Sequence, residues 1–249
     1  MASMTLLTMT QDILSDMESD TVNSINDTTE SLQVAEAIRF VYFNIIDGKN
    51  WPWLRELFQL TASGDAAKPT HMQIPSSIIE VESIRYNTRK STDTRDYYLP
   101  IKYKTVEEFL VISGNRNSSS SDILVVTDFS STPLNIVTNK APQYFTSFDD
   151  NYVIFDSYDN TVDTTLQTAK TQCFGERYPT FTLTDSFVAD MPVQMFSYFL
   201  NEAKAYCFAT FKQTTNAKAE QYSVSQRRRM SQEAWKLNKG ITYPNYGRK

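Results

Sequence analysis

The side chains that most often carry catalysis are scarce in this chain. Its 249 residues include one histidine, His71, and six glycines, none in a G-x-G arrangement. The missing glycine pattern excludes phosphate-binding and dinucleotide-binding loops. A single histidine excludes zinc sites built on several histidines and acid–base schemes that need two. A nucleophile would need His71 beside a serine, threonine or cysteine and a carboxylate, but we expect an exposed loop histidine and no enzyme.

The two cysteines, Cys173 and Cys207, indicate packing rather than chemistry. They stand 34 residues apart without a C-x-x-C spacing, which indicates neither a zinc cluster nor a disulfide framework. Both lie among apolar residues, so we expect small core side chains in a reducing compartment.

A run of acidic and amide residues after position 155 could be taken for a calcium loop. Aligned on the twelve-residue motif, the run has Tyr158 at the third position, Thr161 at the sixth, where glycine is required, and Gln167 at the twelfth, where glutamate is required. We therefore predict no metal and no cofactor. The oxygen-bearing residues of the run are Asp156, Asp159, Asn160 and Asp163.

Adjacent carboxylates at 107–108 and 149–150 could suggest a glycosidase, but a catalytic pair must face across a cleft. The second pair is explained more simply as a hairpin turn. The aromatic residues of 144–158 could stack on bases, yet no lysine or arginine occurs from 141 to 169. Because phosphate contacts dominate nucleic-acid affinity, we interpret these aromatics as hairpin packing.

Charge is distributed unevenly along the chain. Residues 203–249 hold ten Lys or Arg against two Glu, whereas residues 1–202 hold 14 Lys or Arg against 27 Asp or Glu. This asymmetry predicts an acidic body with a basic C-terminal region, which suits an acidic partner surface or nucleic acid. A solvated helix end is the alternative.

The basic region contains the residues that we predict to bind a partner. Three consecutive arginines spread over most of a helix circumference, and Trp235 follows within two turns; aromatic residues with arginine are typical of interface anchors. The last segment could dock in extended form, with a frayed terminus as the alternative. The predicted binding residues are Arg227, Arg228, Arg229, Trp235, Lys239, Tyr243, Pro244, Tyr246 and Arg248.

Helices are predicted at both ends of the sequence. Apolar residues at helical spacing predict helices at 5–17 and 29–47, the second closed by Gly48, and Pro52 suits the first turn of a short helix through Phe58. Near the other end, Asp190 is the expected N-cap of a helix that runs to about Phe211 with Pro192 in its first turn, and a more polar helix follows to about Leu237.

The middle of the chain has the composition of strands. A capping box predicts a helical turn at 105–110, and 113–121 is the most disorder-prone stretch, after a loop at 61–70. Alternating and β-branched residues predict strands at 73–84, 97–103, 122–129, 134–138, 144–148, 152–155 and 164–174.

The order of these elements predicts an α+β fold. Its N- and C-terminal helices pack as a bundle, a central mostly antiparallel β domain lies between them, and an extended C-terminal arm follows. The corresponding regions are 1–60, 61–189, 190–237 and 238–249. No lysine or arginine precedes Arg39 and no apolar stretch approaches about 18 residues, so we expect neither signal peptide nor membrane anchor.

The whole plan resembles the head-to-tail adaptor proteins of short-tailed bacteriophages, also called tail tubular protein A or tail accessory factor. The resemblance is best in 5–60 and 142–249; about 88–140 departs from it, and an insertion is one interpretation. It rests on TLLTMTQDILSDM, TESLQVAEAIRFVYFNII, NWPWLRELFQL, IPSSIIEVESIRY, YFTSFDDNYVIFDSYD, MPVQMFSYFLNEAKAYCFATF, RRRMSQEAWKLNKG and ITYPNYGRK.

The resemblance implies a non-enzymatic ring subunit of a virion. In the family, twelve copies bridge the portal to the tail nozzle, the C-terminal extension clamps the portal, and DNA passes through the channel without sequence-specific binding. By this resemblance Lys239, Tyr243, Pro244, Tyr246 and Arg248 form the clamp, and 227–235 its helical base. The protein would occur in the virion neck, and in host cytoplasm during assembly. The alternatives are a virion cell-wall hydrolase that uses a carboxylate pair, or a DNA-binding module that uses the basic arm.

Overall fold

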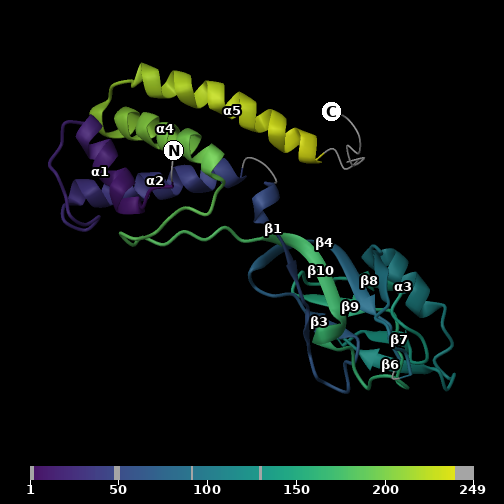
Figure 1. The fold of residues 1–249 in the computed structure, drawn as a ribbon. Coiled ribbons are helices and arrows are strands. Elements are labelled where there is room, and N and C mark those ends of the chain that lie inside the picture. Colours follow the sequence, from purple (N-terminus) through teal and green to yellow (C-terminus); the bar gives the residue numbers. More distant parts are fainter. Residues whose placement is uncertain (1–2, 48–50, 91, 129–130, 239–249) are drawn as a thin grey trace. The chain divides into compact units, whose positions relative to one another are not determined.

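The chain forms two compact units with mixed α+β architecture (Figure 1), which confirms the predicted fold class. The helical unit consists of residues 1–54 and 179–249, and the β unit consists of residues 55–178. The β unit is thus inserted into the helical unit. The computed structural model describes residues 3–47, 51–90, 92–128 and 131–238, with only the backbone for 229, 230 and 232–238.

Apolar stripes at helical spacing build the core of the helical unit. α1 and α2 pack against each other, α4 packs on both, and α5 packs along α4. Tyr42, Phe196 and Phe199 are the largest fully buried side chains of this core. The helices are α1 (Leu6–Asp16), α2 (Thr29–Asp47), η1 (Pro52–Leu54), α4 (Val193–Cys207), the π-helical turn η3 (Phe208–Lys212) and α5 (Ala217–Asn238).

The predicted helices at 5–17 and 29–47 are confirmed as α1 and α2; Gly48 lies outside the described residues. The prediction of a helix over 52–58 is wrong beyond Leu54, because Arg55–Phe58 forms strand β1, whose pairing with another strand overrides local preference. The Asp190 N-cap is also wrong. α4 begins at Val193, with Pro192 in the N-cap position.

The β unit is organised by one mixed sheet. Its strand order is β1-β10-β4-β5-β8-β9-β3-β2, and each neighbouring pair is antiparallel except β5 and β8. A separate hairpin joins β6 and β7. The strands are β1 (Arg55–Phe58), β2 (Thr61–Ala62), β3 (His71–Gln73), β4 (Ile78–Asn87), β5 (Tyr98–Tyr103), β6 (Ile123–Thr127), β7 (Pro133–Val137), β8 (Tyr144–Thr146), β9 (Tyr152–Phe155) and β10 (Thr171–Arg177); the helices are α3 (Val106–Gly114) and η2 (Thr168–Lys170).

Several local predictions in this unit are confirmed. Thr105 caps α3 by accepting a hydrogen bond from the Glu108 amide at 3.4 Å. In the turn between β8 and β9, the Asp149 carboxylate accepts from the amides of Asn151 and Tyr152. The predicted strand at 164–174 is wrong in its first half. Strand β10 begins only at Thr171, since residues 166–167 bond instead to Pro69 and Tyr86.

The segment 113–121, predicted as the most disorder-prone, is anchored by Arg116. This guanidinium donates to the backbone oxygens of Asn135 and Asp156 at 2.9 and 2.6 Å, and to the Asp156 carboxylate at 2.8 Å. The other Asp156 oxygen accepts from two backbone amides and the Ser157 hydroxyl. Asp156 is therefore a buried structural centre of the β unit, rather than part of a calcium loop.

Candidate functional site

The predicted partner-binding residues begin on the outer face of α5. This helix docks on α4 through a polar face: the Ser223 hydroxyl donates to Glu202, and the Gln226 amide donates to the Ser197 hydroxyl at 2.9 Å. Ala219 is buried on the same face. In the part of α5 whose side chains are described, small residues and hydrogen bonds therefore hold the helix to α4.

Most other described side chains of α5 are exposed, and they include two arginines as well as a tyrosine and a valine. Arg227 and Arg228 are exposed. Tyr222 and Val224 are 50% and 52% exposed. Val224 is three and four residues before the two arginines and so lies beside them on the helix surface, whereas Tyr222, five and six residues before them, does not. Tyrosine and arginine are both residue types common in protein interface anchors. This exposed set, Tyr222, Val224, Arg227 and Arg228, is called the α5 face below.

The other predicted binding residues have no described side chains. Arg229 and Trp235 lie within α5, where the structure describes only the backbone. The clamp residues Lys239, Tyr243, Pro244, Tyr246 and Arg248 lie outside the described residues. The structure therefore places Arg227 and Arg228 together on an exposed helix. Val224 lies beside them and Tyr222 is exposed on the same helix, although the sequence did not single out either residue.

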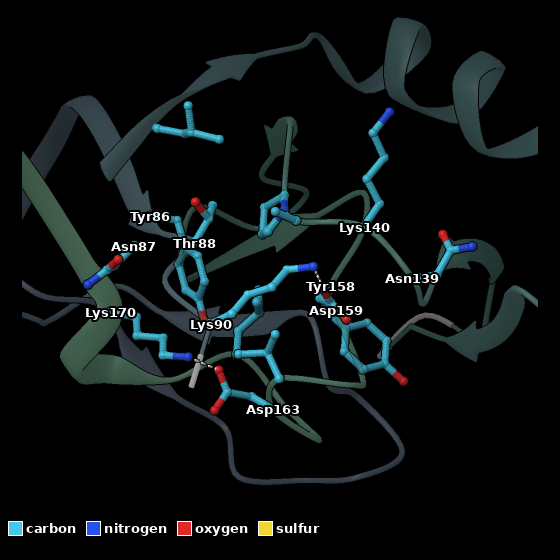
Figure 2. A pocket seen from close by; sticks show the side chains of 15 residues that line it. Tyr86, Asn87, Thr88, Lys90, Asn139, Lys140, Tyr158, Asp159, Asp163 and Lys170 are labelled. Carbon is cyan, nitrogen blue, oxygen red and sulfur yellow. Dashed lines mark hydrogen bonds and ion pairs between the residues drawn. The ribbon is translucent and has the colours of Figure 1, made fainter. Parts of the chain in front are cut away.

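A second candidate site is a pocket of about 270 Å³ in the β unit, shown in Figure 2. Its apolar lining includes the buried side chains of Tyr86, Tyr158 and Leu166. Its rim is polar. The charged and amide side chains at the rim are Asn87, Lys90, Asn139, Lys140, Asp159, Asp163 and Lys170.

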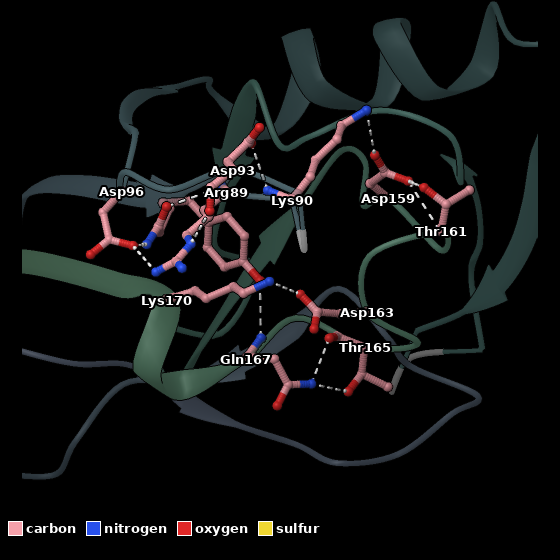
Figure 3. A network of polar contacts seen from close by, with 12 residues as sticks. Arg89, Lys90, Asp93, Asp96, Asp159, Thr161, Asp163, Thr165, Gln167 and Lys170 are labelled. Carbon is pink, nitrogen blue, oxygen red and sulfur yellow. Dashed lines mark hydrogen bonds and ion pairs between the residues drawn. The ribbon is translucent and has the colours of Figure 1, made fainter.

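Ion pairs join the loops around this pocket (Figures 2 and 3). Lys170 contacts Asp163, and Lys90 lies 3.9 Å from Asp159, whose other oxygen accepts from the Thr161 hydroxyl at 2.6 Å. The Tyr86 hydroxyl accepts from the Gln167 amide at 3.1 Å. Burial raises the pKa of Tyr86 to about 12, so this phenol is neutral at physiological pH.

A neighbouring part of the network fixes the loop between β4 and β5 (Figure 3). Asp96 accepts from the Asn87 amide at 2.9 Å and from Arg89 at 3.3 Å, and both hydrogen bonds hold the pKa of this carboxyl below its usual value. Asn87 in turn accepts from the amides of Arg89 and Tyr97. Hydrogen bonds therefore fix the loop that forms part of the pocket wall. The two aspartates that line the pocket, Asp159 and Asp163, are paired with lysines of the same chain.

The arrangement suits holding a polar ligand better than acid–base catalysis. Asp159 and Asp163 are both on one loop and both paired, whereas a glycosidase needs two carboxylates facing each other across the bound sugar. Across the residues that the structure describes, no group of three or more His, Cys, Asp or Glu side chains could hold a metal ion.

His71 corrects an expectation from the sequence. It lies in strand β3 rather than an exposed loop and is only 1% exposed, because β3 pairs with β9 in the interior of the sheet. Its Nε2 lies 3.0 Å from the Asp128 carboxylate. Burial lowers the pKa of His71 more than this partner raises it, so the histidine is neutral at physiological pH.

The prediction that both cysteines are core residues is confirmed. Cys173 and Cys207 are free thiols with 1% and 0% exposure. Burial raises the pKa of each thiol to about 12, which keeps both unreactive.

The sequence did not indicate the pocket, because its residues come from segments that only the tertiary fold brings together. They belong to 86–90, Leu99, 139–142, 158–166 and Lys170. The local signal was the cluster of Asp159, Asn160 and Asp163, which resembles a ligand loop without its required glycine and glutamate. Asp159 and Asp163 do line a pocket, as partners of lysines.

Comparison with known proteins assigns no family, since neither a family model nor a curated protein matches the chain. Within the described part of the chain, none of the helices combines the length and apolar character needed to cross a membrane.

Proposed function

We propose that the protein is a structural subunit of a virion, a head-to-tail adaptor that forms a ring, joins the portal to the tail nozzle and encloses the DNA exit channel. The sequence resemblance suggests this function, and the α5 face is the observation that supports it. Arg227 and Arg228 are exposed beside Val224, and Tyr222 is exposed earlier on the same helix, so α5 offers a basic surface with exposed apolar and aromatic side chains before the C-terminal arm. A carboxylate-bearing surface of the portal is the partner that this chemistry suits.

The proposed adaptor acts by repetition of one contact. A surface that binds a different surface on the next copy generates a ring when the rotation closes. Each copy then presents its own α5 face and arm, so individually weak contacts with the portal gain from multivalency. In this proposal the arm, with Lys239, Tyr243 and Tyr246, extends the contact that α5 begins.

Binding to the cognate portal tests the proposal. In native mass spectrometry of the mixed proteins, we expect a portal species that carries a ring of copies. Replacing both Arg227 and Arg228 by Glu should weaken portal binding at least tenfold. The matched control replaces Arg39 and Lys212 by Glu, the same charge change at two exposed residues outside α5, and should leave binding within twofold. Absence of any complex with an intact portal would contradict the adaptor function.

Deletion of 238–249 tests the contribution of the arm to portal binding separately from that of the α5 face. We expect the truncated protein to keep its circular dichroism spectrum and to lose stable portal binding. Undiminished binding would remove the arm from the proposed interface while leaving the α5 face in it.

The alternatives predict different results. A cell-wall hydrolase would clear a band in a peptidoglycan zymogram, and Asp159→Asn or Asp163→Asn would abolish the band if the pocket performed the reaction. A DNA-binding module would bind duplex DNA with an affinity that falls steeply with salt. We expect neither a cleared band nor DNA binding comparable with portal binding.

A further inference from the structure

A second hollow in the β unit runs along the edge of strand β4. Four consecutive residues, Ile78 to Val81, line this groove of about 560 Å³. Successive side chains of a strand point to opposite faces. A hollow that four consecutive residues line therefore follows the edge of the strand, where the backbone is accessible, rather than one face of the sheet.

The groove lies beside the half of β4 that does not pair with β5. β5 pairs with β4 only from Ile84 to Asn87, and its last residues, Lys102 and Tyr103, pair with β8 instead. Among the residues that the structure describes, no strand therefore pairs with this edge along Ile78–Ser83. The opposite edge of the same segment is paired with β10.

Two irregularities shape this half of β4. The pairing with β10 shifts register twice, so Ile79 and Glu82 have no direct partner on β10. Gly175 of β10 allows the close approach, because a Cβ there would lie 2.1 Å from the Glu80 carbonyl oxygen. Bulges of this kind redirect side chains, and Ile79 is 50% exposed at the groove.

Several exposed apolar side chains line the groove. Tyr103 and Tyr178 are 60% and 53% exposed, and both line the groove with Ile79. Phe145 and Val153, from the hairpin of β8 and β9, line it too. An extended peptide could therefore bury alternate apolar side chains while its backbone pairs with β4.

Acidic side chains surround the same edge. Glu80 and Asp150 line the groove, and Glu176 lies opposite Glu80 in the register with β10. Burial raises the pKa of Glu176, and repulsion from Glu80 adds to the rise. Two arginines lie near this edge: Arg55 is 2.8 Å from Glu82, and Arg177, opposite Ile78 in the register with β10, is 3.7 Å from Glu56. The carboxylates still outnumber the two arginines, so the edge attracts positive charge.

We propose that this groove receives an extended, basic segment of a partner protein, which pairs its backbone with the open edge of β4 along Ile78–Ser83. Lysine or arginine side chains of the segment would lie beside Glu80 and Asp150, and apolar ones beside Ile79, Tyr103 and Tyr178. The inference concerns the β unit alone and does not depend on the adaptor function.

Peptides test the backbone pairing directly. The probe is the acetylated and amidated octapeptide KVKVKVKV, titrated into the full-length protein and followed by amide hydrogen exchange. We expect binding with at least tenfold slower exchange of amides in 78–83. The control peptides carry N-methyl groups on either the odd or the even residues, which preserves charge and side chains but removes donors from one peptide edge. One of the two should lose at least tenfold in affinity.

Protein variants test the charge complementarity. Glu80→Lys should weaken binding of the unmethylated peptide at least fivefold. Glu107→Lys, an equal charge change at an exposed position of α3 away from the groove, should leave affinity within twofold. Circular dichroism of each variant checks that the β unit remains folded.

Each outcome decides the proposal. Protection of 78–83 that one methylated peptide fails to produce supports strand addition. Equal binding of all three peptides shows charge attraction only and overturns the proposal, as does the absence of binding at millimolar peptide. Equal weakening by Glu80→Lys and Glu107→Lys would place the peptide elsewhere on the acidic surface and overturn it as well.

Discussion

The helical unit and the β unit bury different kinds of group. Among the described residues, the buried histidine and the buried carboxylates all lie in the β unit: His71, Asp128 and Asp156. The core of the helical unit is almost entirely aliphatic and aromatic. Apolar burial is non-directional and indifferent to pH, whereas a buried charge is tolerated only while its partners remain in place. The two units should therefore respond differently to the same perturbation.

The largest difference should follow the loss of Arg116. Arg116→Ala leaves Asp156 buried with its backbone and hydroxyl donors but without its cation, which costs about 3–5 kcal/mol. We expect the β unit to unfold at lower denaturant while the helical signal at 222 nm remains. Urea titrations followed by circular dichroism and by amide exchange in each unit measure both. Arg39→Ala, which breaks an exposed pair within α2, is the control and should cost less than about 0.5 kcal/mol. A single shared transition shifted for both units would contradict the comparison.

A smaller effect should appear with pH. The pKa of His71 is lowered in the folded protein, so protonation favours the unfolded state, and stability is lost as pH falls from about 6.5 toward the folded pKa. The loss can reach about 1.4 kcal/mol per pH unit. His71 is the sole histidine of the sequence, so a neutral His71→Gln variant should flatten the slope between pH 7.5 and 5.5. An unchanged slope in the variant would assign the pH dependence to other groups.

The smallest effect should come from an ion-pair cluster in the helical unit. Lys204 of α4 contacts Asp12 and Asp16 of α1 at 2.8 and 2.6 Å. Burial alone would lower the pKa of Lys204, but its hydrogen bonds to the two aspartates outweigh burial and raise it. Both aspartates are more than a third exposed, so Lys204→Met should cost less than about 1 kcal/mol. Urea midpoints at low and high salt measure the effect, which should shrink in 0.5 M NaCl. A loss above 2 kcal/mol would show that polar contacts matter as much here as in the β unit.

The same contrast explains what the sequence could predict. The helix at 29–47 follows from spacing alone, because most apolar residues at helical spacing in α2 are buried; Leu32 and Phe40 are the exposed exceptions. The cap at Thr105 and the turn at 149–151 are local hydrogen-bond patterns, and they were predicted for that reason. Helices, caps and turns depend on residues close together in sequence, so a short stretch of sequence is enough to predict them.

The failures involve partners that are distant in sequence. His71 looked like an exposed loop residue because Asp128, its partner, is 57 positions away. Arg116 lies in a serine-rich stretch, and no nearby residue indicates that it pairs with Asp156, 40 positions away. The pocket and the β4 groove depend on several segments each, so their residues could not be grouped without the fold. For the partner-binding residues, helix periodicity showed only that three consecutive arginines spread around the helix; it did not indicate which of them are exposed, nor the exposure of Tyr222.

The insertion of one unit into the other has a consequence for synthesis on the ribosome. α1 and α2 emerge first, but their core needs Phe196 and Phe199 of α4. The intervening 55–178 must be translated before then, which takes about 6–25 s at 5–20 residues per second. The contiguous β unit can fold as soon as β10 emerges, while the nascent α1 and α2 still expose an unfilled apolar surface. A chaperone that binds nascent chains would therefore find its longest-lived target in the first 54 residues.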